Sequence, residues 1–516
     1  MMARARRCFL LAAGALALIG GAAKAETTVN VGLKAADVSV LDPHVSTKSD
    51  DKTIFAHIFS GLVRFKSGSI DPGQIEPDLA ESWSASADGK VWTFKLRKGV
   101  QFHHGYGEFT ADDVVYSLQR AADPKRSGVS SDYRPFDKIE KVDKHTVRIS
   151  LKAPVPSLLG LVANYHGGNI VSKKAAEELG DKLKQKPIGT GPFMFKDYAA
   201  KQSITLVANK AYYRGAPKID RIVFKFVPSD SSRELAFQKG ELQLFVGMRE
   251  ERWVKRMRGG SDVVVDVFQP GELRTLHLNT SIKPLDDVRV RKAIAHALNR
   301  DDFIKLVGAS VTQTSWSPVP NGYLGQTADL PKYPFDLAKA KALLKEAGHP
   351  NGFKLSVIIT KRSALLKPMQ VIQEQLRAVG IILDLNVVEH SAFHAQIRKN
   401  LSAMVLYGAA RFPVADTYLT QFYHSRSIVG APTAVTNFSH CKVADAEIDA
   451  ARREPDAKKQ LALWATAQRK LMEQVCSVPL FEQLQVWARR KSIVYGYKLE
   501  GALSLGPEFT QASTAK

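Results

Sequence analysis

The sequence has 516 residues, of which 45% are hydrophobic and 24% are charged. This length suffices for two or three domains with a large buried core, and the composition excludes a disordered chain or a coiled coil. The formal net charge is +22, but lysine and arginine are spread along the chain. We find no zinc-finger spacing, no RNA-recognition motif and no basic arm, so nucleic-acid binding is not expected.

The first 25 residues predict a cleavable secretory signal peptide. Three arginines between positions 4 and 7 precede an apolar run from Cys8 to about Ala23, and small residues surround Lys24. This order is typical of such signals, with cleavage expected after Ala25. A retained membrane anchor is the alternative, but the run is shorter than the ~20 apolar residues that a membrane span needs. We therefore expect an exported, soluble mature protein with a net charge of +18.

The N-terminal half predicts strands and one well-marked helix. Apolar residues alternate over 28–34, 90–99 and 145–151, which is typical of strands with one buried face. In the stretch "TADDVVYSLQRA" the candidate N-cap Thr110 is followed three residues later by Asp113. This pair matches a capping box, so a helix is predicted to begin at Thr110.

The C-terminal half alternates helical and extended patterns. Residues 286–300 and 336–348 have apolar positions at helical spacing, with aspartates before the first turn. Residues 368–388 predict a helix, a turn at Gly380 and a strand, and residues 459–475 predict a helix before a strand at 486–490. No Gly/Ser/Pro-rich linker appears. The pattern indicates an α/β fold whose lobes, if there are several, are joined by strands rather than tethers.

Two cysteines, Cys441 and Cys476, remain after removal of the signal. In an oxidising compartment two cysteines favour one disulfide, and two separate buried thiols are the alternative. No cysteine cluster has the spacing of a metal site. His390 and His394 could share a helix face as metal ligands, but no third ligand stands nearby. The sequence therefore predicts neither a metal nor a cofactor.

Motifs of catalysis are absent from the sequence. It contains no GxSxG, HExxH or Walker-type motif, and "GYGEFT" lacks the third glycine of a dinucleotide fingerprint. No nucleophile, base and orienting group can be assembled from the pattern. A secreted hydrolase is thus the weaker hypothesis, and a binding protein without chemistry of its own is favoured.

Seven segments together resemble the extracytoplasmic solute-binding proteins of dipeptide, oligopeptide and nickel importers, known as family 5. The resemblance extends over about residues 29–490 and includes "IFSGLVRF", "FTADDVVYSLQR" and "PIGTGPFMFKDY". It implies a two-lobed periplasmic-binding-protein fold of class II type, with the ligand in the cleft between the lobes. It further implies a discontinuous lobe I, an extra subdomain within it and a lobe II, with the bounds 26–60, 187–270 and 481–516 for lobe I, 61–186 for the subdomain and 271–480 for lobe II.

The same resemblance implies the protein's partners and location. Members are periplasmic, are usually monomers, and deliver a small ligand to an inner-membrane ABC permease whose ATPase subunits drive import. A receptor that senses a ligand for a membrane signalling protein would have the same sequence features, and a chaperone-like peptide binder is a further alternative.

The stretch "YGAARFPVADTYL" resembles the ligand loop of the peptide-binding members. That loop usually has Gly-Trp and then, about three residues on, an Asp that pairs with the ligand's α-ammonium group. Here Tyr407 and Gly408 stand near the Gly-Trp position, and Arg411 falls where the Asp is expected. A guanidinium repels an ammonium group and suits a carboxylate or phosphate. We expect Arg411 to bind an acidic group of the ligand; the alternative is that it pairs with Asp416 and braces its own loop.

Four further residues are candidates for the ligand site. Lys361 and Arg362 end a predicted strand and resemble the basic residue that meets the ligand's carboxyl terminus in some dipeptide binders. Plain surface exposure is the alternative for both. Asp37, just after the first strand, is the candidate partner for an ammonium group, and Tyr133 is the candidate aromatic wall on the opposite lobe.

The expected ligand follows from these residues and from the family. Peptides are the family default, but the loss of the Asp favours non-peptides that carry a carboxylate or phosphate, such as opine-like conjugates or sugar acids. Nickel is less favoured, because the sequence contains no histidine cluster.

Overall fold

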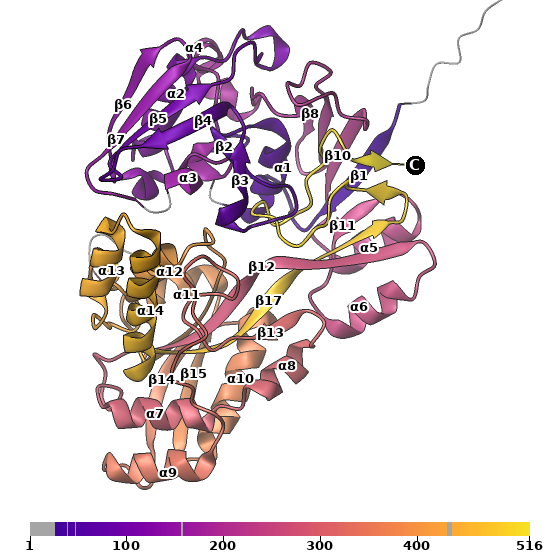
Figure 1. Cartoon of the computed structure of the whole chain (residues 1–516). Helices are drawn as coiled ribbons and strands as arrows, with labels where there is room; N and C mark the ends of the chain where they lie inside the picture. The colour runs from indigo at the N-terminus through magenta and orange to yellow at the C-terminus, as the bar shows by residue number, and fades with distance from the viewer. Residues whose placement is uncertain (1–25, 39, 47, 156–157, 431–435, 516) are drawn as a thin grey trace, which may run out of the picture.

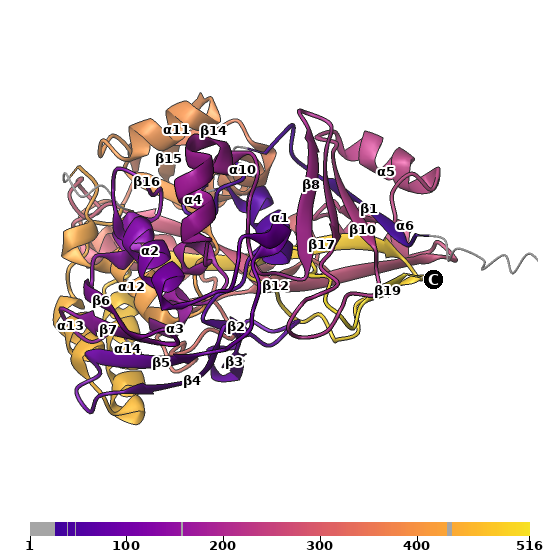
Figure 2. The same cartoon turned by 90° about the horizontal axis from the view of Figure 1, so that it is seen from above.

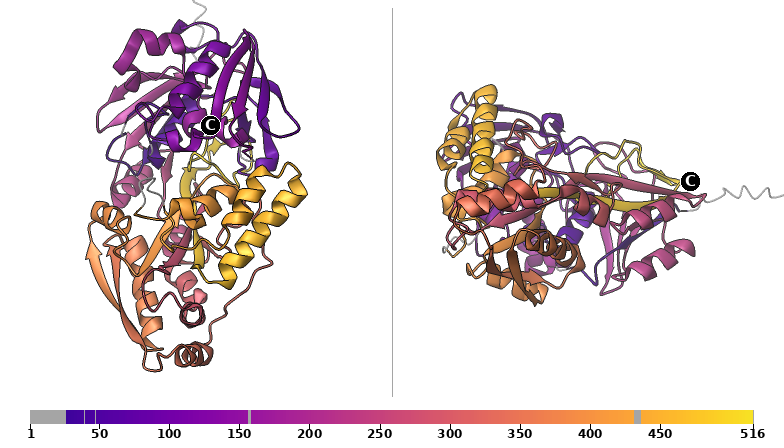
Figure 3. Two further views of the ribbon diagram at one scale, coloured as in Figure 1. Left: turned by 90° about the vertical axis from the view of Figure 1, so that its left-hand side faces the viewer. Right: turned by 90° about the horizontal axis from the view of Figure 1, so that it is seen from below.

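The computed structural model describes residues 26–38, 40–46, 48–155, 158–430 and 436–515 as a two-lobed α/β molecule (Figure 1). Figure 3 shows the lobes one above the other, with the N-terminal segments and the C-terminus together in the upper lobe. Within these ranges, no helix has the length and apolarity that a membrane crossing requires. The predicted signal peptide lies outside the described residues.

The largest sheet extends through both lobes. Its strand order is β16 (Met404–Ala409), β12 (Val263–Leu278), β17 (Ser477–Arg490), β11 (Leu244–Val246), β1 (Thr28–Leu33), β10 (Arg221–Phe226), β9 (Ser203–Ala208) and β8 (Phe193–Ala199), and β13 (Thr312–Thr314) also pairs with β17. One end of β12 pairs with β16 in the lower lobe, and one end of β17 pairs with β11 in the upper lobe. The two long strands run side by side between the lobes (Figure 2). The lobes are therefore joined by strands, as the sequence predicts.

The upper lobe contains a second, four-stranded sheet with its own hydrophobic core. Its order is β4 (Ala80–Ala85), β5 (Val91–Leu96), β7 (Thr146–Leu151) and β6 (Phe136–Asp143), and α2 (Ala111–Ala122), α3 (Leu158–Leu161) and α4 (Lys173–Leu179) lie against this unit. The predicted capping box is confirmed, since the Thr110 N–H donates to the Asp113 carboxylate over 3.0 Å. The rest of this lobe includes β2 (Val63–Phe65), β3 (Ile75–Pro77), α1 (Ser49–Ile58), α5 (Asp230–Gln238) and α6 (Glu251–Arg258).

The lower lobe is mainly helical around β12, β16, β17 and a parallel pair of strands, β14 (Phe353–Thr360) and β15 (Ile381–Val388). Its helices are α7 (Val288–Ala297), α8 (Arg300–Val307), α9 (Leu337–Glu346), α10 (Ser363–Arg377), α11 (His390–Ile397), α12 (Ala415–Tyr423), α13 (Asp445–Arg453) and α14 (Ala457–Glu473). Asp287 and Asp336 cap α7 and α9, and Gly380 makes the turn from α10 to β15 with a φ of +89°. These predicted elements are confirmed; the bounds of the lobes stay a prediction.

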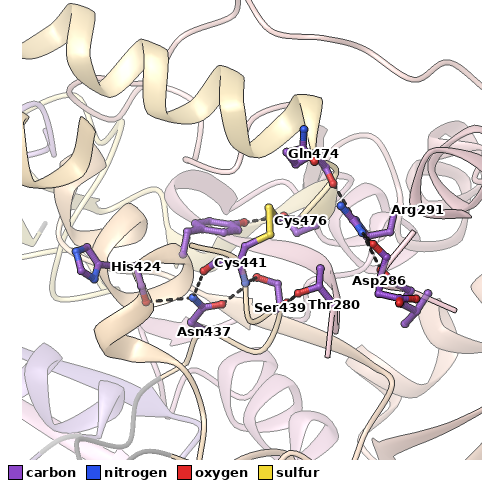
Figure 4. The surroundings of a disulfide bond; sticks show 12 residues. Thr280, Asp286, Arg291, His424, Asn437, Ser439, Cys441, Gln474 and Cys476 are labelled. Carbon is purple, nitrogen blue, oxygen red and sulfur yellow. Dashed lines mark hydrogen bonds between the residues drawn. A yellow bond between two sulfur atoms is a disulfide. The ribbon is translucent and has the colours of Figure 1, made fainter. Parts of the chain in front are cut away.

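The predicted disulfide joins Cys441 to Cys476, with 5.9 Å between the Cα atoms (Figure 4). Beside it the Asn437 side chain donates to the Cys441 carbonyl over 2.7 Å and accepts from the Ser439 hydroxyl. Thr280 donates to the Ser439 carbonyl. The bond therefore fixes a hydrogen-bonded turn to the start of β17, inside the lower lobe.

Candidate functional site

The expected ligand loop lies between β16 and α12, where the lower lobe meets the upper one. The Arg411 Nε donates to the Gln421 side chain over 2.8 Å, and Nη1 donates to the Ala410 carbonyl over 3.0 Å. The guanidinium carbon lies 5.6 Å from the centre of the Phe422 ring. The Arg411 carbonyl accepts from the Tyr323 hydroxyl. These contacts hold the side chain in place, and none of them brings a carboxylate to its positive charge.

The alternative partner for Arg411 is already engaged elsewhere. Asp416, on the first turn of α12, pairs with Arg452 through two hydrogen bonds of 2.9 and 3.2 Å. Among the residues that the structure describes, Arg411 forms no ion pair with a carboxylate. The alternative pairing of Arg411 with Asp416 is therefore wrong, because α13 brings Arg452 to the same carboxylate.

Gly408 leaves space for a buried cation that sequence analysis missed. A Cβ at position 408 would lie 1.5 Å from Nη1 of Arg274, on the neighbouring strand β12. Arg274 is only 5% exposed; it pairs with Glu272 and donates to Gln483, each over 2.9 Å. Burial raises the pKa of Glu272, but Arg249 and Arg274 lower it to about 2. Tyr407 next to the glycine is half-buried and packs 5.2 Å from the Phe438 ring.

Phe412 connects the loop directly to the upper lobe. Its ring occupies the space that a side chain at Gly160 would need, since a Cβ there would lie 1.9 Å from the ring. The ring centre lies 5.6 Å from that of Phe65. In Figure 1, α12 of the lower lobe lies below α3 of the upper lobe at this boundary. The lobes are therefore in contact beside Arg411.

A pocket that is partly open to solvent lies on the upper-lobe side of this boundary. Its walls include Lys52, Phe65, Tyr165 and His166. The Lys52 ammonium group donates to the Tyr165 hydroxyl over 3.0 Å and lies 4.6 Å from the ring centre. Neither ring nitrogen of His166 has a hydrogen-bond partner within the described chain. Burial, and then the charges of Lys52 and Arg411, hold the pKa of His166 well below 6.5.

The other candidates occupy separate places. Asp37 is half-buried, and the Tyr198 hydroxyl donates to its carboxylate, with 3.0 and 2.9 Å to the two oxygens. Lys361 and Arg362 are both exposed at the start of α10, and Lys361 pairs with Glu389. The structure brings none of these three into contact with Arg411.

Tyr133 lies in the core of the upper lobe's second sheet rather than at a free surface. It is 2% exposed, its ring packs 5.3 Å from Phe136, and its hydroxyl donates to the Leu161 carbonyl over 2.8 Å. The expected aromatic wall is therefore wrong for this residue, because both its ring face and its hydroxyl are used within the fold.

The two histidines of α11 form a pair of their own. The Nε2 atoms of His390 and His394 lie 3.2 Å apart, and the His394 ring lies 6.0 Å from Tyr407. In the described ranges, no group of three potential metal ligands among His, Cys, Asp and Glu is found. Burial lowers the pKa of both imidazoles, which keeps them neutral at pH 7.

Comparisons with known proteins agree with the two-lobed fold. The family described as "Bacterial extracellular solute-binding proteins, family 5 Middle" matches residues 74–429. The Di/tripeptide-binding protein 2 of Pseudomonas aeruginosa is 33% identical over 475 residues, which cover 86% of this chain and 87% of that protein. A solved structure of MoaA from A. tumefaciens R10 in complex with mannopinic acid is 46% identical, covers 95% of this chain and 100% of its own, and has a TM-score of 0.83. DppA from Helicobacter pylori, in complex with the peptide STSA, is 30% identical and covers 95% and 98% of the two chains, with a TM-score of 0.79.

Proposed function

Since this chain belongs to the family 5 bacterial extracellular solute-binding proteins, we propose that its ligand is a small carboxylate-bearing solute of the opine kind. The family places it as the solute-binding component of an ABC importer. In this proposal the protein is exported, closes its lobes on the ligand and presents it to an inner-membrane permease. It performs no chemistry on the ligand.

The observation that supports an acidic ligand is the uncompensated charge of Arg411. Arg411 is half-buried at the boundary between the lobes, and a bound ligand that displaces water there would leave its charge costly unless an anion pairs with it. Because Asp416 is bound to Arg452, an acidic group of the ligand can serve as the partner of Arg411. The planar guanidinium can hold a carboxylate through two parallel hydrogen bonds.

The same loop disfavours an ordinary peptide. A peptide's α-ammonium group needs a carboxylate, and the loop from Ala409 to Val414 contains none. The higher identity to MoaA, whose structure contains mannopinic acid, supports the same preference. If the ligand also carries an amine, Asp37 is the proposed partner, and Lys361 and Arg362 stay proposed contacts for a second acidic group.

A thermal-shift experiment on residues 26–516 tests this proposal. Mannopinic acid is compared with neutral dipeptides, using the wild type, Arg411→Asp and the control Arg377→Asp, which reverses an exposed charge on α10. A ligand at 100 times its Kd adds about 2.7 kcal/mol of stability, so binding raises the Tm visibly. We expect mannopinic acid to stabilise the wild type and the control but not Arg411→Asp. Stabilisation by dipeptides alone, equal in all three proteins, would contradict the proposal and identify a peptide binder.

A further inference from the structure

The upper lobe carries a second cationic group, Lys52, that forms no ion pair within the described residues. We propose that Lys52, together with His166, binds the same acidic group of the ligand as Arg411, so that one anion bridges the two lobes. This inference rests on the proposed function and extends it, because it assigns the residues of the upper lobe that recognise the ligand.

Lys52 lies in the first half of α1 and is half-buried in the wall of the pocket. Its ammonium group contacts the hydroxyl and the ring of Tyr165, but it forms no ion pair with any carboxylate of the described chain. An ammonium group has three donors, and the hydroxyl of Tyr165 accepts one of them. Two donors are therefore free for an anion that enters the pocket.

One acidic residue, Glu508, also lines the pocket, and it forms hydrogen bonds with residues of the upper lobe. Its carboxylate accepts from the Ser504 hydroxyl over 3.3 Å, and its amide donates to the Tyr497 hydroxyl. Burial raises the pKa of Glu508, while the charge of Arg64 opposes this shift. The Glu508 carboxylate is thus hydrogen-bonded to Ser504, and among the described residues no ion pair joins it to Lys52.

His166 supplies two further polar atoms that lack partners. Both ring nitrogens are buried, and neither forms a hydrogen bond within the described residues. A neutral imidazole has one donor and one acceptor, and leaving them unpaired in a buried place is unfavourable. His166 also has a φ of +52°, which is uncommon for a residue other than glycine. A ligand oxygen beside Lys52 would accept the hydrogen bond that this ring can donate.

The charges of Lys52 and Arg411 act on the same imidazole. Both lower the pKa of His166, although the two cations come from different lobes. The lobes also meet next to this group, through Phe412 against Gly160. Closure without a ligand therefore brings two like charges toward one another, which is unfavourable. An anion between them reverses the sign of this interaction, so closure depends on an acidic ligand.

Isothermal titration calorimetry with mannopinic acid tests the shared site on the mature protein. The variants are Lys52→Gln, Arg411→Gln and the double variant, with Lys48→Gln as the control because Lys48 is exposed near the same end of α1. Truncating one partner of an enclosed charge pair weakens binding by about 30-fold or more, and each single variant should lose this much. If both residues hold one anion, the affinity of the double variant falls by clearly less than the product of the two fold-losses of the single variants. The control should stay within about twofold of the wild type, as expected for a distant surface charge.

Two outcomes would overturn the shared site while leaving the proposed function intact. In one, Lys52→Gln binds like the wild type while Arg411→Gln is weakened. In the other, the fold-loss in affinity of the double variant equals the product of the two single fold-losses. The two residues would then bind separate groups of the ligand. Failure of mannopinic acid and of other opine acids to bind the wild type would instead reject both proposals. His166→Asn, whose side chain tolerates a positive φ, gives a second variant in case Lys52→Gln does not fold, and it should also weaken binding.

Discussion

The fit of Arg274 over Gly408 predicts that even a methyl group at position 408 destabilises the protein. In Gly408→Ala the new Cβ would lie 1.5 Å from Nη1 of Arg274, where an ordinary contact needs about 3.5 Å. The guanidinium must therefore retreat by about 2 Å. Its contacts with Glu272 and Gln483, now 2.9 Å long, would then exceed hydrogen-bonding distance.

The expected cost follows from these two contacts. A hydrogen bond to a charged group contributes about 1.5–3 kcal/mol. Replacing a glycine within a strand by alanine also stabilises the folded state by about 0.5–1 kcal/mol, because alanine loses less conformational freedom on folding. We therefore expect Gly408→Ala to lower the free energy of unfolding by about 3 kcal/mol. Urea unfolding of the mature protein without ligand measures this change.

A double-mutant comparison isolates the cause of the loss. In an Arg274→Ala background the clash is absent, so Gly408→Ala should there cost nothing further. If Gly408→Ala alone changes the free energy of unfolding by less than about 0.5 kcal/mol, which is the ordinary effect of a surface substitution, then Arg274 can move freely and the reasoning fails.

Three other predictions concern stability and pH. Replacing Cys441 and Cys476 by Ala opens a link across 35 residues and should cost about 4 kcal/mol of unfolding free energy, measured in urea; an unchanged midpoint would contradict the structural role of the bond. Burial raises the pKa of Glu482 to about 7, so the folded state binds the proton more tightly and wild-type stability should fall as pH rises from about 4.5 to 7, by about 3 kcal/mol. Glu482→Gln should remove this fall in urea unfolding at pH 5 and pH 8, and an equal fall in the variant would assign it to another group. Tyr133→Phe should cost about 1 kcal/mol and leave the affinity for mannopinic acid unchanged; weaker binding in calorimetry would return Tyr133 to the ligand site.

Local patterns predicted most elements because their causes lie within a few residues. The capping box of Thr110 and Asp113 joins positions three apart, and Gly380 makes its turn through its own backbone. The helices at 288–297 and 337–346 begin at aspartates that the sequence shows directly. The helix of residues 363–377 begins five residues before the predicted Pro368, because a proline within a helix weakens the helix without always ending it.

Residues of the candidate site were predicted only where a family pattern indicated them. Arg411 could be singled out because it replaces an acidic residue of the ligand loop. Arg274 gave no such signal, because its position over Gly408 depends on the pairing of β12 with β16, far apart in the sequence. Tyr133 looked free in the sequence, and only the packing of the upper lobe's second sheet shows that its hydroxyl is used.

The sequence by itself therefore determined the family, the α/β class and the presence of one unusual cation in the ligand loop. The tertiary structure decided which charged side chains form ion pairs and which have no partner of opposite charge among the described residues. Arg452 reaches Asp416 from α13, so Asp416 is not the partner of Arg411, and Lys52 lines the pocket of the upper lobe. Periodicity and capping act through neighbouring residues, whereas the pairing of charges depends on which surfaces the folded chain brings together.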